Sequence, residues 1–336
     1  MSDIVCVGHS IVDIYVGIPD AHIHTDETLK RQEVCLLWGE KYPIHDMQIG
    51  MGGNALNVSV GLHLLGVRSS LVSACGKDFF GLYLQASLKR SSVDLTYLQQ
   101  TNRTDTTVAL TLQGERTLLV YHGDEPYLFP EALESDEPTW IFLTSIGTTN
   151  FHVMYEAVLT YMERHPKVLL AYNPGSAEIR QVQQVYKVFP KTNILFVNID
   201  EAGALLSQSD IVARTDLTLE DKIRRLIEGL KKLGSKSIII TCGGEGAFGY
   251  DGLNLYYQPS FATEVVERTG AGDAFTGGVL AGLLNSHGLS ESLRWGAAQS
   301  ASAIRVVGAT TGLMNKNQML ESLKQNTSVQ PKKISL

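Results

Sequence analysis

The feature that most constrains the fold of this 336-residue chain is a repeated alternation of short apolar runs with segments of helical spacing. The runs are rich in β-branched residues and are short, as buried strands of a parallel sheet are. They are DIVCVG at 3–8, VRSSLVSACG at 67–76, WIFLTS at 140–145, KVLLAYN at 167–173, NILFVN at 193–198 and SIIITC at 237–242. Helical segments are expected at 52–66, 79–92, 217–233, 273–285 and 291–306. Because parallel strands need crossover connections, this alternation predicts an α/β fold around a parallel sheet.

One part of the chain breaks the alternation and predicts a separate β element. Residues 106–121 hold two β-rich runs on either side of a glycine, which is the pattern of a hairpin. Residues 19–48 carry two prolines, three histidines and little helical period. The length of the chain suits one large domain with an appendage. We expect an α/β domain at 1–12, 49–100 and 125–336, a small β lid at 13–48 and 101–124, and a frayed polar tail from residue 325.

Charge, hydropathy and cysteine usage narrow the classes of function. A formal net charge of −7 is a poor basis for binding nucleic acid, which needs a basic surface. No apolar stretch is long enough to span a membrane, and no basic region precedes the apolar residues of the N-terminus as in a signal peptide. The four cysteines are widely spread, which favours reduced cytoplasmic thiols over disulfides or zinc. We therefore expect a cytoplasmic protein without nucleic-acid or membrane partners.

The segment ERTGAGDAFTGGVLAGLL at 267–284 carries the clearest chemical signal. The turn of Gly270, Ala271 and Gly272 opens an apolar helix, so free backbone N–H groups there form a site for an anion. Asp273 in the first turn would repel a phosphate that was merely bound. It fits better as the base that takes a proton from a hydroxyl while the N–H groups stabilise a transferring phosphoryl group. The structural alternative is an acidic residue that interacts only with the helix dipole.

Two further glycine-rich segments predict a close approach of the backbone to a ligand. In MGGNALNVSVGLHLLG at 51–66, Asn54 and Asn57 offer amides that suit polyhydroxyl ligands; the alternative is Asn54 as a helix N-cap with Asn57 exposed. In SIIITCGGEGAFGYDG at 237–252, the glycines match a dinucleotide-binding pattern, but strand-like residues rather than a helix follow. We therefore reject a Rossmann site, disfavour a dehydrogenase, and predict a strand-end loop that contacts phosphate or adenine. The sequence also lacks the P-loop pattern.

Taken in order, these segments resemble the signatures of the ribokinase-like carbohydrate kinases, the PfkB family. GGNALN at 52–57 is similar to the N-terminal signature of that family, and TGAGD at 269–273 to its C-terminal signature. Between them, GKDFFG at 76–81, NIDE at 198–201 and TCGGEGA at 241–247 resemble three shorter family motifs. Each motif alone is weak, but five in the family's order cover nearly the whole chain.

The resemblance implies a three-layer α/β/α fold with a central, mostly parallel sheet, a small β-sheet lid, and ATP and Mg²⁺ as cofactors. It implies Asp273 as the catalytic base beside an anion hole of Gly270, Ala271 and Gly272. It also implies that Asn198 and Glu201 organise magnesium and phosphate, with Glu201 acting through water. Nucleotide binding is implied for Thr241, Gly243 and Gly246, and binding of substrate hydroxyls for Asp13, Gly53 and Asn57. Asp13 also interrupts an apolar run, where a charge needs a partner; the alternative is a solvated strand position.

The chain departs from the family pattern beside the anion hole. Glu267 and Arg268 stand where the family usually has Asp-Thr. The family aspartate helps to bind a monovalent cation in some members, so with Glu267 in its place the dependence on K⁺ stays open. Arg268 adds a cation that either contacts a phosphate or pairs with a nearby acid.

The expected activity is transfer of the γ-phosphoryl group of ATP to a hydroxyl of a sugar or sugar-like substrate. A nucleoside is the first alternative, because the same Asp and Asn groups suit a ribose ring. A phosphosugar is another, with Arg103 or Arg116 as the basic group at its far end. Outside enzymes, the alternative is a non-catalytic nucleotide- or sugar-binding protein. Exposed lid edges also predict a homodimer through the lid, with Trp38, Tyr42 and Tyr121 covering the substrate or packing against the second subunit.

Overall fold

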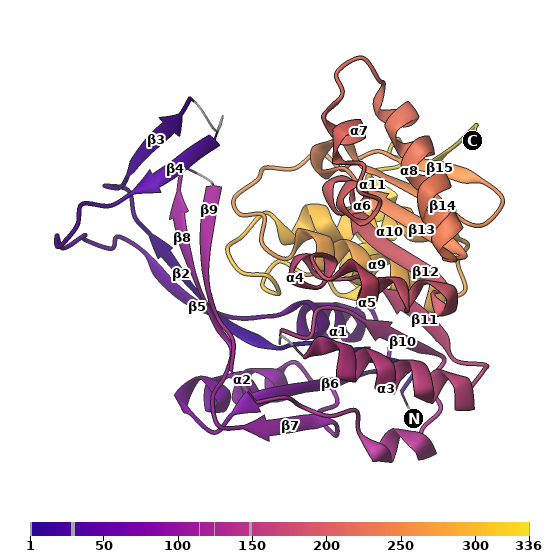
Figure 1. Ribbon diagram of the computed structural model, residues 1–336, viewed down its shortest axis with the longest axis horizontal. Helices are drawn as coiled ribbons and strands as arrows, with labels where there is room; N and C mark the ends of the chain where they lie inside the picture. The colour runs from indigo at the N-terminus through magenta and orange to yellow at the C-terminus, as the bar shows by residue number, and fades with distance from the viewer. Residues whose placement is uncertain (1, 28–30, 114, 124, 148–149, 336) are drawn as a thin grey trace.

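A computed structural model describes residues 2–27, 31–113, 115–123, 125–147 and 150–335. Within these residues, a ten-stranded sheet with the order β16-β15-β14-β13-β12-β11-β10-β1-β6-β7 forms the centre of the molecule (Figure 1). The strands are β1 (Ile4–Val7), β6 (Ser69–Gly76), β7 (Leu98–Thr101), β10 (Trp140–Leu143), β11 (Leu169–Tyr172), β12 (Ile194–Asn198), β13 (Ser237–Thr241), β14 (Ala247–Tyr250), β15 (Leu255–Gln258) and β16 (Lys332–Ile334). In this order, the strands from β13 to β7, which include β1 and β6, pair in parallel, and β14, β15 and β16 extend one edge in antiparallel pairing.

Helices cover both faces of this sheet. They are α1 (Asn54–Leu64), α2 (Phe79–Arg90), α3 (Phe151–Arg164), α4 (Ser176–Ile179), α5 (Val182–Tyr186), α6 (Ile199–Leu205), α7 (Ser209–Ala213), α8 (Leu219–Leu233), α9 (Ala271–Leu284), α10 (Leu289–Ala303) and α11 (Lys316–Gln325). Strand β1 shows the two faces directly, because Val5 and Val7 belong to one buried cluster and Ile4 and Cys6 to the other. Alternate residues of a strand point to opposite faces, so the sheet has a hydrophobic core on each side.

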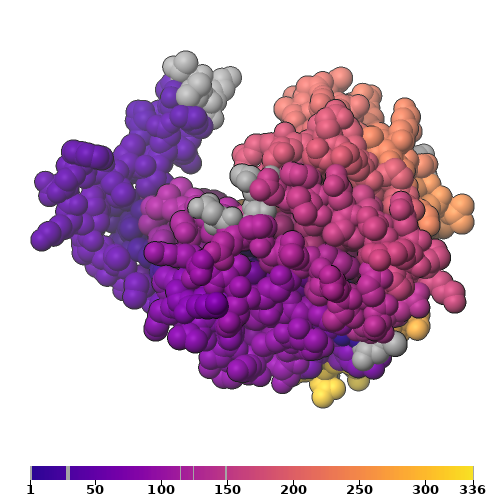
Figure 2. Space-filling view, turned by 60° about the horizontal axis from the view of Figure 1, so that its bottom comes forward, coloured from indigo at the N-terminus to yellow at the C-terminus, as the bar shows by residue number. Residues whose placement is uncertain are grey.

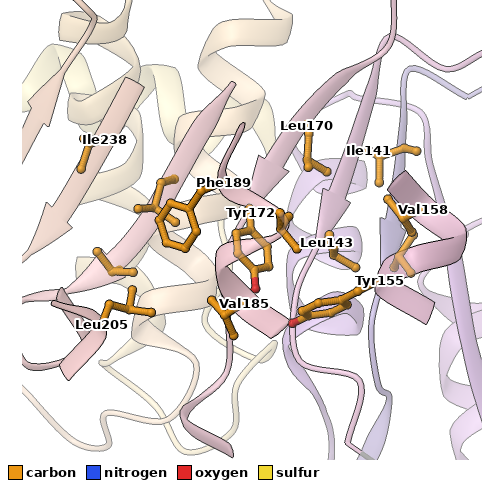
Figure 3. Packing of buried hydrophobic residues seen from close by; sticks show 14 of the residues in the cluster. Ile141, Leu143, Tyr155, Val158, Leu170, Tyr172, Val185, Phe189, Leu205 and Ile238 are labelled. Atoms are coloured by element: carbon orange, nitrogen blue, oxygen red, sulfur yellow. The ribbon is translucent and has the colours of Figure 1, made fainter. Parts of the chain in front are cut away.

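The first of these clusters lies between the sheet and helices α3, α5 and α8. Figure 3 shows Tyr155 and Val158 of α3 packed against Leu143 and Tyr172 of the strands beneath. The second cluster joins α1, α9 and α10 to the opposite face. The expected three-layer α/β/α fold with a mostly parallel sheet is therefore confirmed, and it places the starts of α1 and α9 on one side of the sheet.

A second, four-stranded sheet with the order β5-β2-β8-β9 stands apart from the central one (Figure 1). Its strands are β2 (Ile11–Gly17), β5 (Met47–Gly52), β8 (Thr106–Leu112) and β9 (Glu115–Tyr121), and a separate pair is formed by β3 (His22–Asp26) and β4 (Arg31–Cys35). The expected hairpin is the antiparallel pair β8–β9. Figure 2 shows a hollow between the indigo N-terminal strands of these small sheets and the rose and salmon part of the body. We call the two small sheets the lid; the predicted boundaries between domain and lid stay a prediction.

The expectation of a frayed tail from residue 325 is wrong. Strand β16 pairs with β15, with Ile334 opposite Leu255. The buried Arg294 guanidinium also donates hydrogen bonds to carbonyls of the preceding segment, at 2.7 Å to Leu323 and 2.8 Å to Val329. Backbone pairing and a distant arginine order this segment, and neither depends on apolar side chains within it. Among the described residues, no helix combines the length and apolar character that a membrane crossing requires.

Candidate active site

The start of helix α9 has the geometry of an anion site. Gly270 is the N-cap residue with φ of 76°, and a Cβ there would lie 2.7 Å from the Cβ of Ala309. Only glycine fits both the left-handed backbone and this close contact. A Cβ on Gly272 would meet no atom within 4 Å, so this side of the turn is open. The first N–H groups of a helix have no partner within it. Of these, the Ala271 N–H donates a long hydrogen bond of 3.3 Å to the Arg268 carbonyl.

Asp273 follows in the first turn and is held by two amides from helix α1. Asn54 Nδ2 donates to Asp273 Oδ1 at 2.9 Å, and Asn57 Nδ2 donates to Oδ2 at 2.8 Å. The alternative of Asn54 as an N-cap with Asn57 exposed is wrong, because Gly53 is the N-cap and Asn57 is buried. Burial raises the pKa of Asp273, while these two hydrogen bonds and the nearby His9 lower it. The result is a fixed, buried carboxyl next to the anion site.

Asp13 reaches the same region from the lid strand β2. It is 8% exposed, its Oδ2 accepts a 3.3 Å hydrogen bond from the Tyr15 hydroxyl, and burial raises its pKa to about 6. The buried position contradicts the alternative of a solvated strand residue. A Cβ on Gly52 would lie 2.1 Å from Asp13 Oδ2, and one on Gly53 would lie 2.5 Å from the carbonyl oxygen of His9. The two glycines therefore let α1 begin directly against Asp13 and β1.

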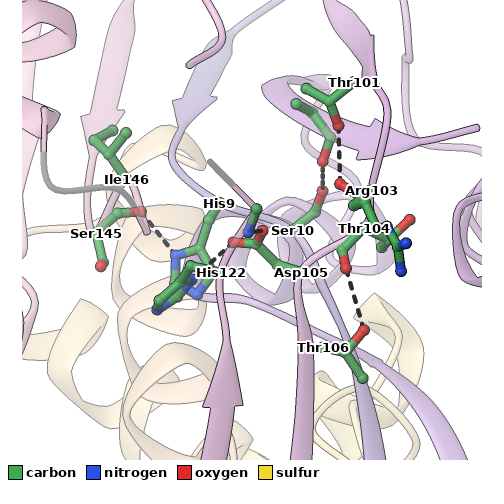
Figure 4. A network of polar contacts seen from close by, with 12 residues as sticks. His9, Ser10, Thr101, Arg103, Thr104, Asp105, Thr106, His122, Ser145 and Ile146 are labelled. Carbon is green, nitrogen blue, oxygen red and sulfur yellow. Dashed lines mark hydrogen bonds and ion pairs between the residues drawn. The ribbon is translucent and has the colours of Figure 1, made fainter. Parts of the chain in front are cut away.

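Two histidines that the sequence reasoning missed, His9 and His122, lie close together near this region (Figure 4). The charge of His9 lowers the pKa of both Asp13 and Asp273, so His9 lies within electrostatic range of the two carboxyls. Its Nδ1 lies 2.9 Å from the Ser145 carbonyl, and its ring meets the ring of His122 edge-on at 6.0 Å. His9 comes two residues after the last residue of β1, and ligands of open α/β folds bind at such strand ends. The position of His9 directly after a predicted strand was the sequence signal that could have identified it.

The residues that are expected to bind the nucleotide line a cavity of about 400 Å³. The loop after β13 contributes Thr241, Gly243 and Gly246, and the start of α9 contributes Ala271 and Gly272. A short 3-10 turn and then the antiparallel strand β14 follow β13, so no Rossmann helix is present there, as expected. The anion site and the strand-end loop thus open into one cavity.

Asn198 and Glu201 lie at the start of helix α6, where they form a capping box. Asn198 Oδ1 accepts from the Glu201 N–H at 2.8 Å, and Glu201 Oε2 accepts from the Asn198 N–H at 2.9 Å. Burial raises the pKa of Glu201, and the charge of Asp273 raises it further. Within the described chain, no group of three or more His, Cys, Asp or Glu is arranged to hold a metal ion. A magnesium ion here would therefore take most of its ligands from phosphate and water, as Mg²⁺ commonly does.

Glu267 and Arg268 both interact with the lid. Glu267 Oε1 accepts from Arg116 Nη1 at 2.8 Å and from the Thr269 N–H at 2.7 Å. Arg268 Nη1 lies 3.9 Å from Glu115 Oε1, and Arg268 also lines the cavity of Thr241, Gly243 and Gly246. The guanidinium of Arg116 is thus engaged by Glu267. Arg103 instead lines a small cavity with His9 and other polar residues, namely Ser10, Thr101, Asp105 and Glu125.

Comparisons with known proteins agree with this geometry. Residues 1–316 match the family model described as pfkB family carbohydrate kinase, and the chain therefore belongs to this family. It is 30% identical to a fructokinase from Escherichia coli over 72% of this chain and 80% of that protein. It is 24% identical to an ATP-dependent 6-phosphofructokinase from Thermoanaerobacterium thermosaccharolyticum over 93% and 90%. Ribokinase from Arabidopsis thaliana, solved with ribose and ATP, superposes with a TM-score of 0.77 at 21% identity over 96% and 99% of the chains.

Proposed function

We propose that the protein transfers the γ-phosphoryl group of ATP to a hydroxyl of a sugar or sugar-like molecule, with Asp273 as the general base. The observation that carries this proposal is the pair of hydrogen bonds from Asn54 and Asn57, which fix both oxygens of a buried carboxylate in the first turn of α9. The same turn opens into the nucleotide cavity. A base and an anion site at one helix start serve the two ends of a phosphoryl transfer.

In the proposed reaction, Asp273 takes the proton of the acceptor hydroxyl as its oxygen attacks the γ-phosphorus. A new P–O bond forms to the acceptor, the bond to the β-phosphate oxygen breaks, and ADP leaves. The N–H groups of Gly270, Ala271 and Gly272 stabilise the charge on the phosphoryl oxygens. Because burial raises the pKa of Asp273, its carboxylate is a stronger base than an exposed aspartate.

The proposed cofactors follow from the groups that face the cavity. ATP would occupy the cavity lined by Thr241, Gly243 and Gly246. Glu201 would hold Mg²⁺ through water, with Asn198 fixing the carboxylate from the capping box. Bound Mg²⁺ neutralises phosphate charge during transfer. A monovalent cation at Glu267 would have to share the carboxylate with Arg116.

The acceptor site favours a sugar over a nucleobase-bearing substrate. Asp13, Gly53 and Asn57 would bind substrate hydroxyls. The small cavity next to them is lined mostly by polar groups, among them His9, Arg103 and Asp105, with Tyr127 as its one phenol ring. This lining suits sugar hydroxyls better than a nucleobase, which calls for aromatic stacking surfaces. Arg103 in that lining keeps a phosphosugar as the second candidate, because its guanidinium suits a phosphate at the far end.

The exposed apolar residues of the lid support a homodimer. Trp38 is fully exposed, and the edge strand β9 exposes consecutive apolar side chains, Leu118, Leu119, Val120 and Tyr121. Apolar patches and strand edges of this kind commonly pair with another chain. We expect sedimentation at micromolar concentration to give a dimer that Leu119→Lys dissociates, and a wild-type monomer would contradict this.

The substrate is tested by coupled ADP release with Mg-ATP over a panel of sugars, sugar acids, phosphosugars and nucleosides. A sugar or sugar acid should respond most strongly. A phosphosugar response that Arg103→Gln abolishes would support the second candidate. Turnover of nucleosides alone would contradict the sugar assignment, and silence across the panel with intact ATP binding would contradict the kinase reaction itself.

A further inference from the structure

The tip of the lid hairpin β8–β9 contacts the loop before the anion site through two ion pairs of opposite polarity. Glu115 and Arg116 are consecutive in the lid, and Glu267 and Arg268 are consecutive in the body. Arg116 pairs with Glu267 at 2.8 Å and Glu115 with Arg268 at 3.9 Å. In Figure 1, the loops next to α9 extend toward this end of the lid. The charges therefore dock one end of the lid on the segment that leads into α9.

The two pairs differ strongly in burial. The side chains of Arg116 and Glu267 are 31% and 9% exposed, whereas those of Arg268 and Glu115 are 66% and 81% exposed. An exposed pair at the longer distance contributes little, because water screens it. A buried carboxylate that loses its cation is costly. The energetic link between lid and body is thus the Arg116–Glu267 pair, and the second pair provides a natural control.

Glu267 connects this pair to the anion site. Its Oε1 accepts from Arg116 Nη1, from the Thr269 N–H at 2.7 Å and from the Thr269 hydroxyl. Thr269 directly precedes Gly270, the N-cap of α9. Glu267 Oε2 is buried without a hydrogen-bond partner. Oε1 therefore carries all the hydrogen bonds found for this carboxylate. Removing Arg116 would favour rotation of the Glu267 carboxylate toward water and away from Thr269.

We propose that Arg116 is a positioning residue for phosphoryl transfer, which sets the turn 269–272 through Glu267 when the lid is docked. This inference rests on the proposed function, because it assigns the turn to the transferring phosphoryl group. Docking of the lid over the acceptor and completion of the anion site are then one event. The lid supplies a guanidinium that acts on the geometry of the site without touching the substrate.

The test compares Arg116→Ala, Arg116→Lys and the matched control Glu115→Gln. Arg116→Ala should lower kcat on the order of 10- to 100-fold, as expected for a small displacement of the transition-state donors. ADP affinity should stay within about 3-fold, because ADP lacks the γ-phosphoryl group that the turn is proposed to stabilise and the strand-end loop of the cavity is unchanged. Arg116→Lys should restore part of kcat, and Glu115→Gln should stay within about 2-fold of wild type.

Two further measurements separate positioning from a general loss of fold. Guanidinium at non-denaturing concentration should restore kcat of Arg116→Ala and leave wild type and Glu115→Gln unchanged. Arg116→Ala combined with Glu267→Gln should be no slower than the slower single variant, because both remove one link. Near-wild-type kcat of Arg116→Ala, additive losses in the double variant, or absence of rescue would each overturn the proposal.

Hydrogen exchange distinguishes failure of this inference from failure of the proposed function. Arg116→Ala should speed exchange of the hydrogen-bonded amides of Thr269 and Ala271 several-fold, and Glu115→Gln should leave them unchanged. This readout needs no turnover. Unchanged exchange in Arg116→Ala contradicts the inference, whereas a wild-type protein that phosphorylates no acceptor contradicts the proposed function alone.

Discussion

Asp13→Asn should make the protein more stable at neutral pH and remove part of its pH dependence. Burial raises the pKa of Asp13 from 3.8 to about 6, and the residue is only 8% exposed. A shift of this size corresponds to about 3 kcal/mol between the two protonation states. The native state binds this proton more tightly than the unfolded chain. Its contribution to stability is therefore complete below the unfolded pKa and is lost as pH rises through about 6.

The measurable part of this effect lies in an accessible pH range. Between about pH 5 and about pH 7, the wild-type protein should lose roughly 1.3 kcal/mol through Asp13 alone, from the two pKa values. The asparagine variant keeps the shape of the side chain and has no proton to lose. The difference in free energy of unfolding between the two proteins should therefore move by that amount in favour of the variant.

The assay is urea unfolding of both proteins at a series of pH values. All other titrating groups are common to the two chains, so their contributions largely cancel in the difference. Parallel stability profiles would refute the reasoning, as would a variant that loses stability relative to wild type as pH rises. The Asp13→Asn variant should also bind the acceptor more weakly, because Asp13 is proposed to bind substrate hydroxyls. Residues that serve a binding site often lower the stability of the fold.

Two other predictions concern the same site. Gly53→Ala should destabilise the fold by about 1–3 kcal/mol, because φ is 97° and a Cβ would lie 2.5 Å from the His9 carbonyl oxygen. Urea unfolding measures this loss, and Gly244→Ala is the control because its Cβ meets nothing within 4 Å; equal losses in the two variants would contradict the prediction. The acid limb of the kcat profile should lie above the ordinary aspartate pKa, because Asp273 must be ionised and burial raises its pKa; a limb at or below that value would contradict the assignment.

The sequence predicted the elements whose causes are local. The helix expected at 217–233 is α8, and Thr218 caps it with a hydroxyl that accepts from the Asp221 N–H, which is a local start signal. The β8–β9 hairpin and the left-handed Gly66 after α1 also follow from short-range patterns. The alternation of apolar runs predicted the central sheet, because buried strands and their crossovers leave a strong periodic signal.

The contacts that shape the site were beyond sequence reasoning because they join distant segments. Asn54 lies 219 residues from Asp273, and Arg116 lies 151 residues from Glu267. No local sequence pattern around these residues predicts either contact. The prediction of a frayed tail from residue 325 failed for the same reason, because β16 is ordered by pairing with β15 rather than by its own composition.

The most direct test of the central claim is the turnover of Asp273→Ala with the best acceptor from the substrate panel, together with its affinity for ADP. We expect kcat to fall by about 10²–10⁴, the usual contribution of a general base. ADP affinity should be retained, because Thr241, Gly243 and Gly246 line the nucleotide cavity without contribution from the Asp273 side chain. Near-full turnover in this variant would contradict the assignment of Asp273 as the base that activates the hydroxyl.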